Sequence, residues 1–154
     1  MYNELGSVYS LQGKADKALE IYKQSLAIDD EYSQTYLLLG DLYLNQNDYD
    51  NSANAYQQAL KWDETLLQAH SALGLVYSRQ NKYDQAIAEN LIVLDKQPSD
   101  ISSLRNLAVL YQQTGKLPEA LQYAQRALAV ASDQDKPSLQ AFIAQIQAQL
   151  QPPK

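Results

Sequence analysis

Apolar residues along this chain recur with the spacing of an amphipathic helix, and the pattern repeats every 34 residues. Tyr36, Leu39, Gly40 and Tyr43 occupy positions i, i+3, i+4 and i+7, which lie on one face of an α-helix. Residues 53–60 show the same spacing in a second helix. Each 34-residue repeat therefore predicts two helices joined by a short turn, and such helix pairs stack because none buries its apolar face alone.

Three columns of equivalent residues define four repeats in phase. One column is small, one is tyrosine and one is leucine: Gly6, Gly40, Gly74 and Ala108; Tyr9, Tyr43, Tyr77 and Tyr111; Leu26, Leu60, Leu94 and Leu128. A small residue lets the two helices of a pair approach, and a facing aromatic residue such as Tyr56 fills the remaining space. We expect the repeats at about residues 1–32, 33–66, 67–100 and 101–134.

The turn inside each repeat carries residues that end one helix and begin the next. Glycine and asparagine adopt the left-handed backbone conformation most easily, and they fill one column: Gly13, Asn47, Asn81 and Gly115. Carboxylates favour the positive end of the following helix, where a first-turn proline is also tolerated, and this column holds Asp16, Asp50, Asp84 and Pro118. The stops and starts thus agree with the apolar periodicity.

The remainder of the chain is close to one extra helix. Residues 136–150 place apolar side chains along one stripe with glutamines opposite, which is typical of a terminal capping helix. The connections between repeats are short and polar, for example at residues 29–31, so we expect a single domain over residues 1–150. Residues 151–154 contain two prolines and are expected to fray.

These columns resemble the tetratricopeptide repeat family. The second repeat carries the family pattern as Tyr36, Leu39-Gly40, Tyr43, Ser52, Tyr56 and Ala59. The resemblance covers residues 1 to about 134, and Ala124 departs from it where the family has an aromatic residue. It implies an all-α fold, a right-handed α-solenoid of four tetratricopeptide helix-turn-helix repeats plus a C-terminal capping helix.

The resemblance also implies a concave groove, lined by the first helix of each repeat, in which a peptide binds. Its positions carry over as Leu37, Asp41, Leu44 and Asn45 in the second repeat, Ser71, Leu75, Ser78 and Arg79 in the third, and Arg105, Val109 and Gln112 in the fourth. We expect the apolar members to face water, and an exposed apolar strip indicates a partner. Arg79 and Arg105 would orient a polar group. The alternatives are that the capping helix or neighbouring molecules cover the strip and that the arginines are merely solvated.

Composition and motifs argue against other classes of function. The net charge is −6 without clustered Lys and Arg, which disfavours nucleic acid, and no stretch reaches the ~20 apolar residues of a membrane helix. The single histidine, His70, falls in a packing column, and no phosphate-binding glycine loop occurs. We therefore expect no enzyme, no catalytic residue, no metal and no cofactor. The lack of cysteine does not fix the compartment, and a soluble, cytoplasmic segment is favoured.

The favoured function is a protein–protein interaction scaffold that binds an apolar or amphipathic peptide segment in its concave groove. Met1 aligns inside the first helix of a repeat, which suggests a fragment. A first alternative is therefore the regulatory or substrate-docking arm of a larger enzyme, such as a glycosyltransferase or a membrane ligase. A second is self-association through the first helix, where Met1, Leu5 and Val8 lack a preceding neighbour. The identity of the partner and the oligomeric state are left open.

Overall fold

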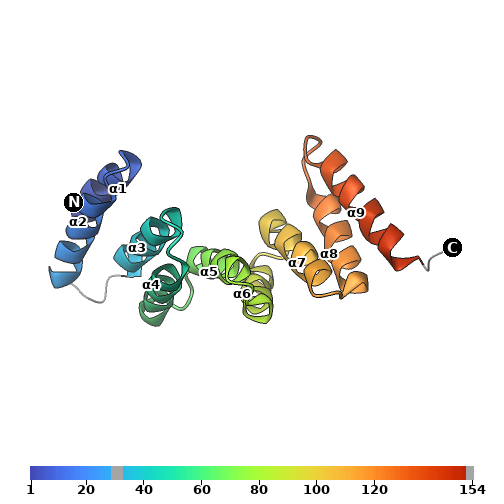
Figure 1. Ribbon diagram of the computed structural model, residues 1–154, viewed down its shortest axis with the longest axis horizontal. Coiled ribbons are helices and arrows are strands. Elements are labelled where there is room, and N and C mark those ends of the chain that lie inside the picture. Colours follow the sequence, from blue (N-terminus) through green and yellow to red (C-terminus); the bar gives the residue numbers. More distant parts are fainter. Residues whose placement is uncertain (29–32, 152–154) are drawn as a thin grey trace. The chain divides into compact units, whose positions relative to one another are not determined.

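The computed structural model describes residues 1–28 and 33–151, and within each of these two ranges short turns connect one helix to the next (Figure 1). The helices are α1 (Tyr2–Leu11), α2 (Ala15–Ile28), α3 (Ser33–Asn45), α4 (Tyr49–Trp62), α5 (Leu67–Arg79), α6 (Tyr83–Lys96), α7 (Ile101–Gln113), α8 (Leu117–Val130) and α9 (Lys136–Leu150). The described residues contain no strand, so the prediction of an all-α repeat fold is confirmed. The predicted connection at 29–31 and residues 152–154 of the predicted frayed tail lie outside the described residues.

Contacts between the helices divide the chain into two compact units, Met1–Asn81 and Lys82–Lys154. In the first unit α1 packs against α2, α3 against α4, and α4 against α5. In the second unit α6 contacts α7, α7 packs against α8, and α8 packs against α9.

The predicted helix stops have the predicted backbone conformation. The φ angles are +71° at Gly13, +58° at Asn47, +58° at Asn81 and +76° at Gly115. The residue after the stop then donates its backbone N–H back to the tyrosine column, as from Lys14 to Tyr9 and from Asp48 to Tyr43, both at 2.9 Å. This pair of features is the Schellman motif, which satisfies carbonyl groups that the helix end would leave without partners.

The first turns of the helices carry the predicted residues, but in α4 the capping side chain belongs to a different residue from the predicted one. Asp16, Asp50 and Asp84 lie in the first turns of α2, α4 and α6, and a proline occupies the first turn of α8. The side chain that caps α4 is Asp48, which accepts a hydrogen bond from the backbone N–H of Asn51 at 3.2 Å. An acidic first turn and a capping carboxylate both stabilise the positive end of a helix.

A glycine and a buried tyrosine hold the α3–α4 pair together in the first unit. Tyr56 is 0% exposed, and a Cβ atom built on Gly40 would lie 2.5 Å from its ring atom Cδ1. The same relation links Gly6 to Tyr22 in the α1–α2 pair, where the corresponding distance is 2.7 Å. Ser52 is fully buried and donates its hydroxyl to the carbonyl oxygen of Gly40 at 2.9 Å, so its burial leaves no unpaired polar group.

In the second unit, the positions equivalent to the glycine and the buried tyrosine hold two small residues. Ala108 and Ala124 replace the glycine and the aromatic residue and are both fully buried. They form a core cluster with Ile143 and Ile146 of α9, which lies beside α8 (Figure 1). Helix α9, predicted at 136–150, therefore contributes side chains to the core of this unit.

Candidate peptide-binding surfaces

The predicted groove residues of the first unit lie mainly on exposed parts of α3 and α5. We call this set the first face: Asp41, Leu44, Asn45, Ser71, Leu75, Ser78 and Arg79. Leu44 and Ser78 are half-buried and the other members are exposed. Leu75 is 40% exposed, to about the same extent as Leu91 at 39% and Ile92 at 40%.

The prediction that Leu37 faces water is wrong. Its side chain is only 5% exposed and belongs to the core of the first unit. Helix α3 contacts α1, α2 and α4, so more of its circumference is covered than the pattern of a two-helix repeat suggests. Leu37 therefore has a packing role and is not a member of the first face.

Asp41 places a carboxylate on the first face beside two tyrosine hydroxyls. Tyr56 donates its hydroxyl to Oδ1 of Asp41 at 2.6 Å. Although Asp41 is exposed as a residue, partial desolvation of its carboxylate raises its pKa above the ordinary value, and the hydrogen bond from Tyr56 opposes that rise. The pKa values of Tyr56 and Tyr22 are raised as well, chiefly by burial and in part by the negative charge of Asp41. The hydroxyl of Tyr22 also lies 3.3 Å from that of Ser7.

The predicted residues of the second unit border a pocket between α7 and α9. The pocket has a volume of about 200 Å³ and is lined by Arg105, Ala108, Val109, Ser138, Leu139 and Phe142. Val109 is 41% exposed, so α9 covers it only in part. The structure thus brings Arg105 and Val109 to one concave site, which we call the α7–α9 pocket.

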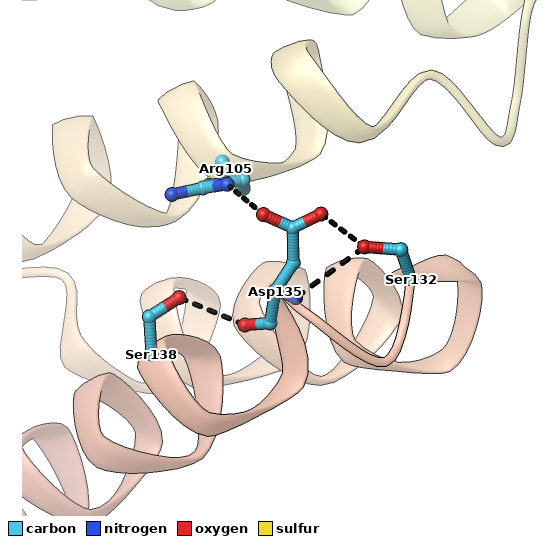
Figure 2. Close-up of polar contacts among 4 residues, drawn as sticks. All are labelled: Arg105, Ser132, Asp135 and Ser138. Atoms are coloured by element: carbon cyan, nitrogen blue, oxygen red, sulfur yellow. Dashed lines mark hydrogen bonds and ion pairs between the residues drawn. The ribbon is translucent and has the colours of Figure 1, made fainter.

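Arg105 lies at the edge of this pocket and is paired with the loop before α9. Figure 2 shows its guanidinium reaching Asp135, with Nη1 at 3.4 Å from Oδ1. The other oxygen of Asp135 accepts a hydrogen bond from the hydroxyl of Ser132 at 2.6 Å, and Ser138 donates to the backbone carbonyl of Asp135 at 2.8 Å. Both charged side chains are more than 40% exposed, and an exposed ion pair of this kind contributes little to stability, so Arg105 can exchange its partner.

Gln112, one turn beyond Val109, also faces α9. Its side-chain amide donates to Oε1 of Gln149 at 3.2 Å. The three groove residues predicted on α7 are therefore all directed toward α9. The apolar stripe predicted along residues 136–150 includes Leu139 and Phe142, but only the fold shows that they share a pocket with Arg105.

The part of the chain that the structure describes offers few other candidates for a catalytic, metal-binding or membrane-spanning element. His70 is half-buried, and its Nε2 atom lies 3.3 Å from the backbone carbonyl of Glu64. Residues 1–28 and 33–151 contain no group of three or more metal-ligating side chains placed to hold an ion. Among the described helices, none has the length and apolar character required to cross a membrane.

Solved structures share this fold over nearly the whole chain. MamA AMB-1 superposes with a TM-score of 0.82 at 21% identity, covering 97% of this chain and 80% of that one. A MamA fragment from Desulfovibrio magneticus RS-1 gives a TM-score of 0.87 at 17% identity, covering 96% and 82%. At these identities the likeness concerns the fold alone. A search of the curated proteins gives no match.

Family models extend the comparison to sequence. One tetratricopeptide repeat model matches residues 1–65, and a second matches residues 37–101 and 71–137. Together these matches run through all four predicted repeats. The chain therefore belongs to the tetratricopeptide repeat family, and its helix pairs form a protein–protein interaction scaffold.

Proposed function

We propose that this scaffold binds apolar or amphipathic segments of partner proteins at two separate surfaces, the first face of the first unit and the α7–α9 pocket of the second unit. The observation that carries the proposal is the pocket itself, which is open, largely apolar in its walls and bordered by an exposed cation. Leu75 and Val109 occupy equivalent positions in successive repeats and are both about two-fifths exposed, at 40% and 41%. Each of the two surfaces thus offers an aliphatic side chain to a partner.

The size of the pocket favours a peptide side chain as its occupant. Its volume of about 200 Å³ is below the roughly 300–1,000 Å³ that is usual for sites that enclose a small molecule. A single aliphatic or aromatic side chain fits such a space, and burying one contributes about 1.5–3 kcal/mol. Arg105 at the edge can pair with a carboxylate of the same segment in place of Asp135.

Introducing a charge at Leu75 or at Val109 is expected to weaken peptide binding to the surface that carries that residue. The expected loss is about tenfold or more, because the burial of one apolar side chain is lost. A random peptide library displayed on phage, selected on the wild-type chain, provides the peptides. Their affinities for Val109→Glu and Leu75→Glu are then measured by fluorescence anisotropy.

The matched control for this experiment is Ala129→Glu, which places the same charge at an exposed position of α8. This variant is expected to bind the selected peptides like the wild type, and circular dichroism should give the same helicity for all three variants. Selected peptides that bind both groove variants with wild-type affinity would remove these surfaces from the proposal.

A second candidate function is self-association through α1, and one comparison within the chain favours it. Leu5 and Val8 are 42% and 48% exposed, whereas their equivalents Leu39 and Leu42 in the second repeat are 6% and 3% exposed. In the second repeat a preceding helix packs on this side, since α2 contacts α3. A second copy of the chain could cover α1 in the same way.

If α1 mediates self-association, the mass measured by light scattering is expected to rise with protein concentration. The variant Leu5→Glu/Val8→Glu should then remain monomeric at every concentration. A wild-type mass that stays at the monomer value throughout the series excludes this candidate and leaves peptide binding untouched.

A further inference from the structure

Two polar bridges between α7 and α9 lie on either side of the α7–α9 pocket. Near the start of α9, Asp135 meets Arg105 at 3.4 Å, and near its end Gln149 accepts the side-chain amide of Gln112 at 3.2 Å. The other residues that line the pocket lie between these bridges along the two helices: Ala108 and Val109 on α7, and Ser138, Leu139 and Phe142 on α9. The pocket therefore has one charged end and one neutral end.

Arg105 is the charged residue that lines the pocket, and its bond to Asp135 is weak. The distance of 3.4 Å exceeds the roughly 2.7–2.9 Å of a good charge-assisted hydrogen bond. The guanidinium carries five N–H donors, and this contact uses only Nη1. Since the side chain of Arg105 is also 46% exposed, it can turn to the carboxylate of a bound segment.

Asp135 does not depend on Arg105 for its place. Its Oδ2 atom accepts the hydroxyl of Ser132 at 2.6 Å, and its backbone N–H lies 3.3 Å from the same hydroxyl oxygen (Figure 2). The side chain of Asp135 is 41% exposed, so water can replace the guanidinium. An exchange of partners at Arg105 therefore leaves neither charge buried and unpaired.

The charges at this end of the pocket favour an acidic ligand over a basic one. Asp133 pairs with Lys136 at 2.7 Å and Asp135 with Arg105, so the two acids and the two bases balance. The start of α9 adds the positive end of a helix dipole, and Ser138 in its first turn lines the pocket. A carboxylate beside the pocket thus meets a guanidinium and a helix N-terminus, both of which would repel a cation.

We propose that the α7–α9 pocket recognises a segment of a partner protein in which an aliphatic or aromatic residue lies next to an aspartate or glutamate. The apolar side chain enters the pocket and contacts Val109, Leu139 and Phe142, while the acid pairs with Arg105. Asp135 occupies Arg105 in the free protein and competes with that acid. This inference rests on the proposed function, because it names the class of segment that the pocket binds.

Peptides selected from a random library on phage first show which segments use the pocket. Pocket binders are those that lose affinity on Val109→Gln, a substitution that removes an apolar contact without adding a charge. These peptides are expected to be enriched in aspartate or glutamate next to an aliphatic or aromatic residue. Peptides that bind elsewhere on the chain should show no such dependence on Val109.

A thermodynamic cycle then tests whether the acid pairs with Arg105. A pocket-binding peptide and its analogue with glutamine in place of glutamate are made with blocked termini and measured on the wild type and on Arg105→Gln. The change of peptide should lower affinity for the wild type about three- to tenfold and leave affinity for Arg105→Gln nearly unchanged. The control Lys96→Gln removes the same charge from an exposed position of α6 and should behave as the wild type does.

The variant Asp135→Asn tests the competition. Asparagine keeps an oxygen that can accept the Ser132 hydroxyl but no longer pairs with Arg105 as an anion. The glutamate peptide is expected to bind this variant about two- to fivefold more tightly than the wild type, and its glutamine analogue should bind both alike. Circular dichroism should give the same helicity for all the variants.

The outcomes separate this inference from the function on which it rests. Pocket binders without an acidic residue, or with a basic one, overturn the inference and leave peptide binding at the pocket intact. A selection in which no peptide depends on Val109 overturns both for this pocket. Equal loss of affinity on the wild type and on Arg105→Gln in the cycle places the acid elsewhere and overturns the inference, and an unchanged affinity on Asp135→Asn overturns the competition.

Discussion

Replacing Tyr56 with alanine is expected to lower the free energy of unfolding of the first unit by about 3–5 kcal/mol. The side chain is 0% exposed, and its ring fills the space that Gly40 leaves between α3 and α4. Truncation leaves a cavity at this contact and also removes the hydroxyl that donates to Asp41 at 2.6 Å. Both effects act in the same direction, because the carboxylate of Asp41 also loses a hydrogen-bond donor.

Urea denaturation followed by far-ultraviolet circular dichroism measures this loss. Asn54→Ala on the same helix is the control, because Asn54 is exposed and its truncation should change stability by less than about 0.5 kcal/mol. Tyr56→Phe separates the two effects, since it keeps the ring and should cost only about 0.5–1.5 kcal/mol. A loss below about 1 kcal/mol for Tyr56→Ala would mean that the ring does not support the helix pair.

The features predicted correctly from the sequence depend on residues close to each other along the chain. Asn47 and Gly115 predicted helix ends because asparagine and glycine adopt the left-handed backbone conformation most easily. Both residues have a positive φ angle in the structure. The small and aromatic columns predicted close helix pairs because their spacing fixes which residues share a helix face. Gly40 and Tyr56 accordingly meet across the α3–α4 pair.

The features that the sequence could not supply depend on how elements pack in three dimensions. Leu37 has the position of a groove residue, yet the neighbours of α3 bury it. The ion pair between Arg105 and Asp135 joins residues 30 positions apart. The residues next to Asp135 in the sequence do not indicate that an arginine of another helix lies close to it. Exposure and pairing are properties of the assembled unit, so a repeat pattern predicts which helix face a residue occupies but not what covers that face.

Replacing Gly40 with alanine tests whether the small column exists because of the ring opposite it. The added Cβ atom would lie 2.5 Å from Cδ1 and 2.8 Å from Cζ of Tyr56, and the ring is fully buried and has no room to retreat. Overpacking of this kind costs about 1–3 kcal/mol. Alanine favours helix over glycine by only about 0.8–1.0 kcal/mol, so the clash is expected to dominate and the single variant to be less stable.

The same substitution should change sign once the ring is removed. In the Tyr56→Ala background the methyl group enters the vacated space and the higher helix propensity of alanine remains, so Gly40→Ala is expected to stabilise by about 1 kcal/mol or more. Ala108 and Ala124 in the second unit already combine these two residue types, both fully buried. Urea denaturation of the wild type, both single variants and the double variant gives the coupling energy. Purely additive effects would show that Gly40 is small for a reason other than Tyr56.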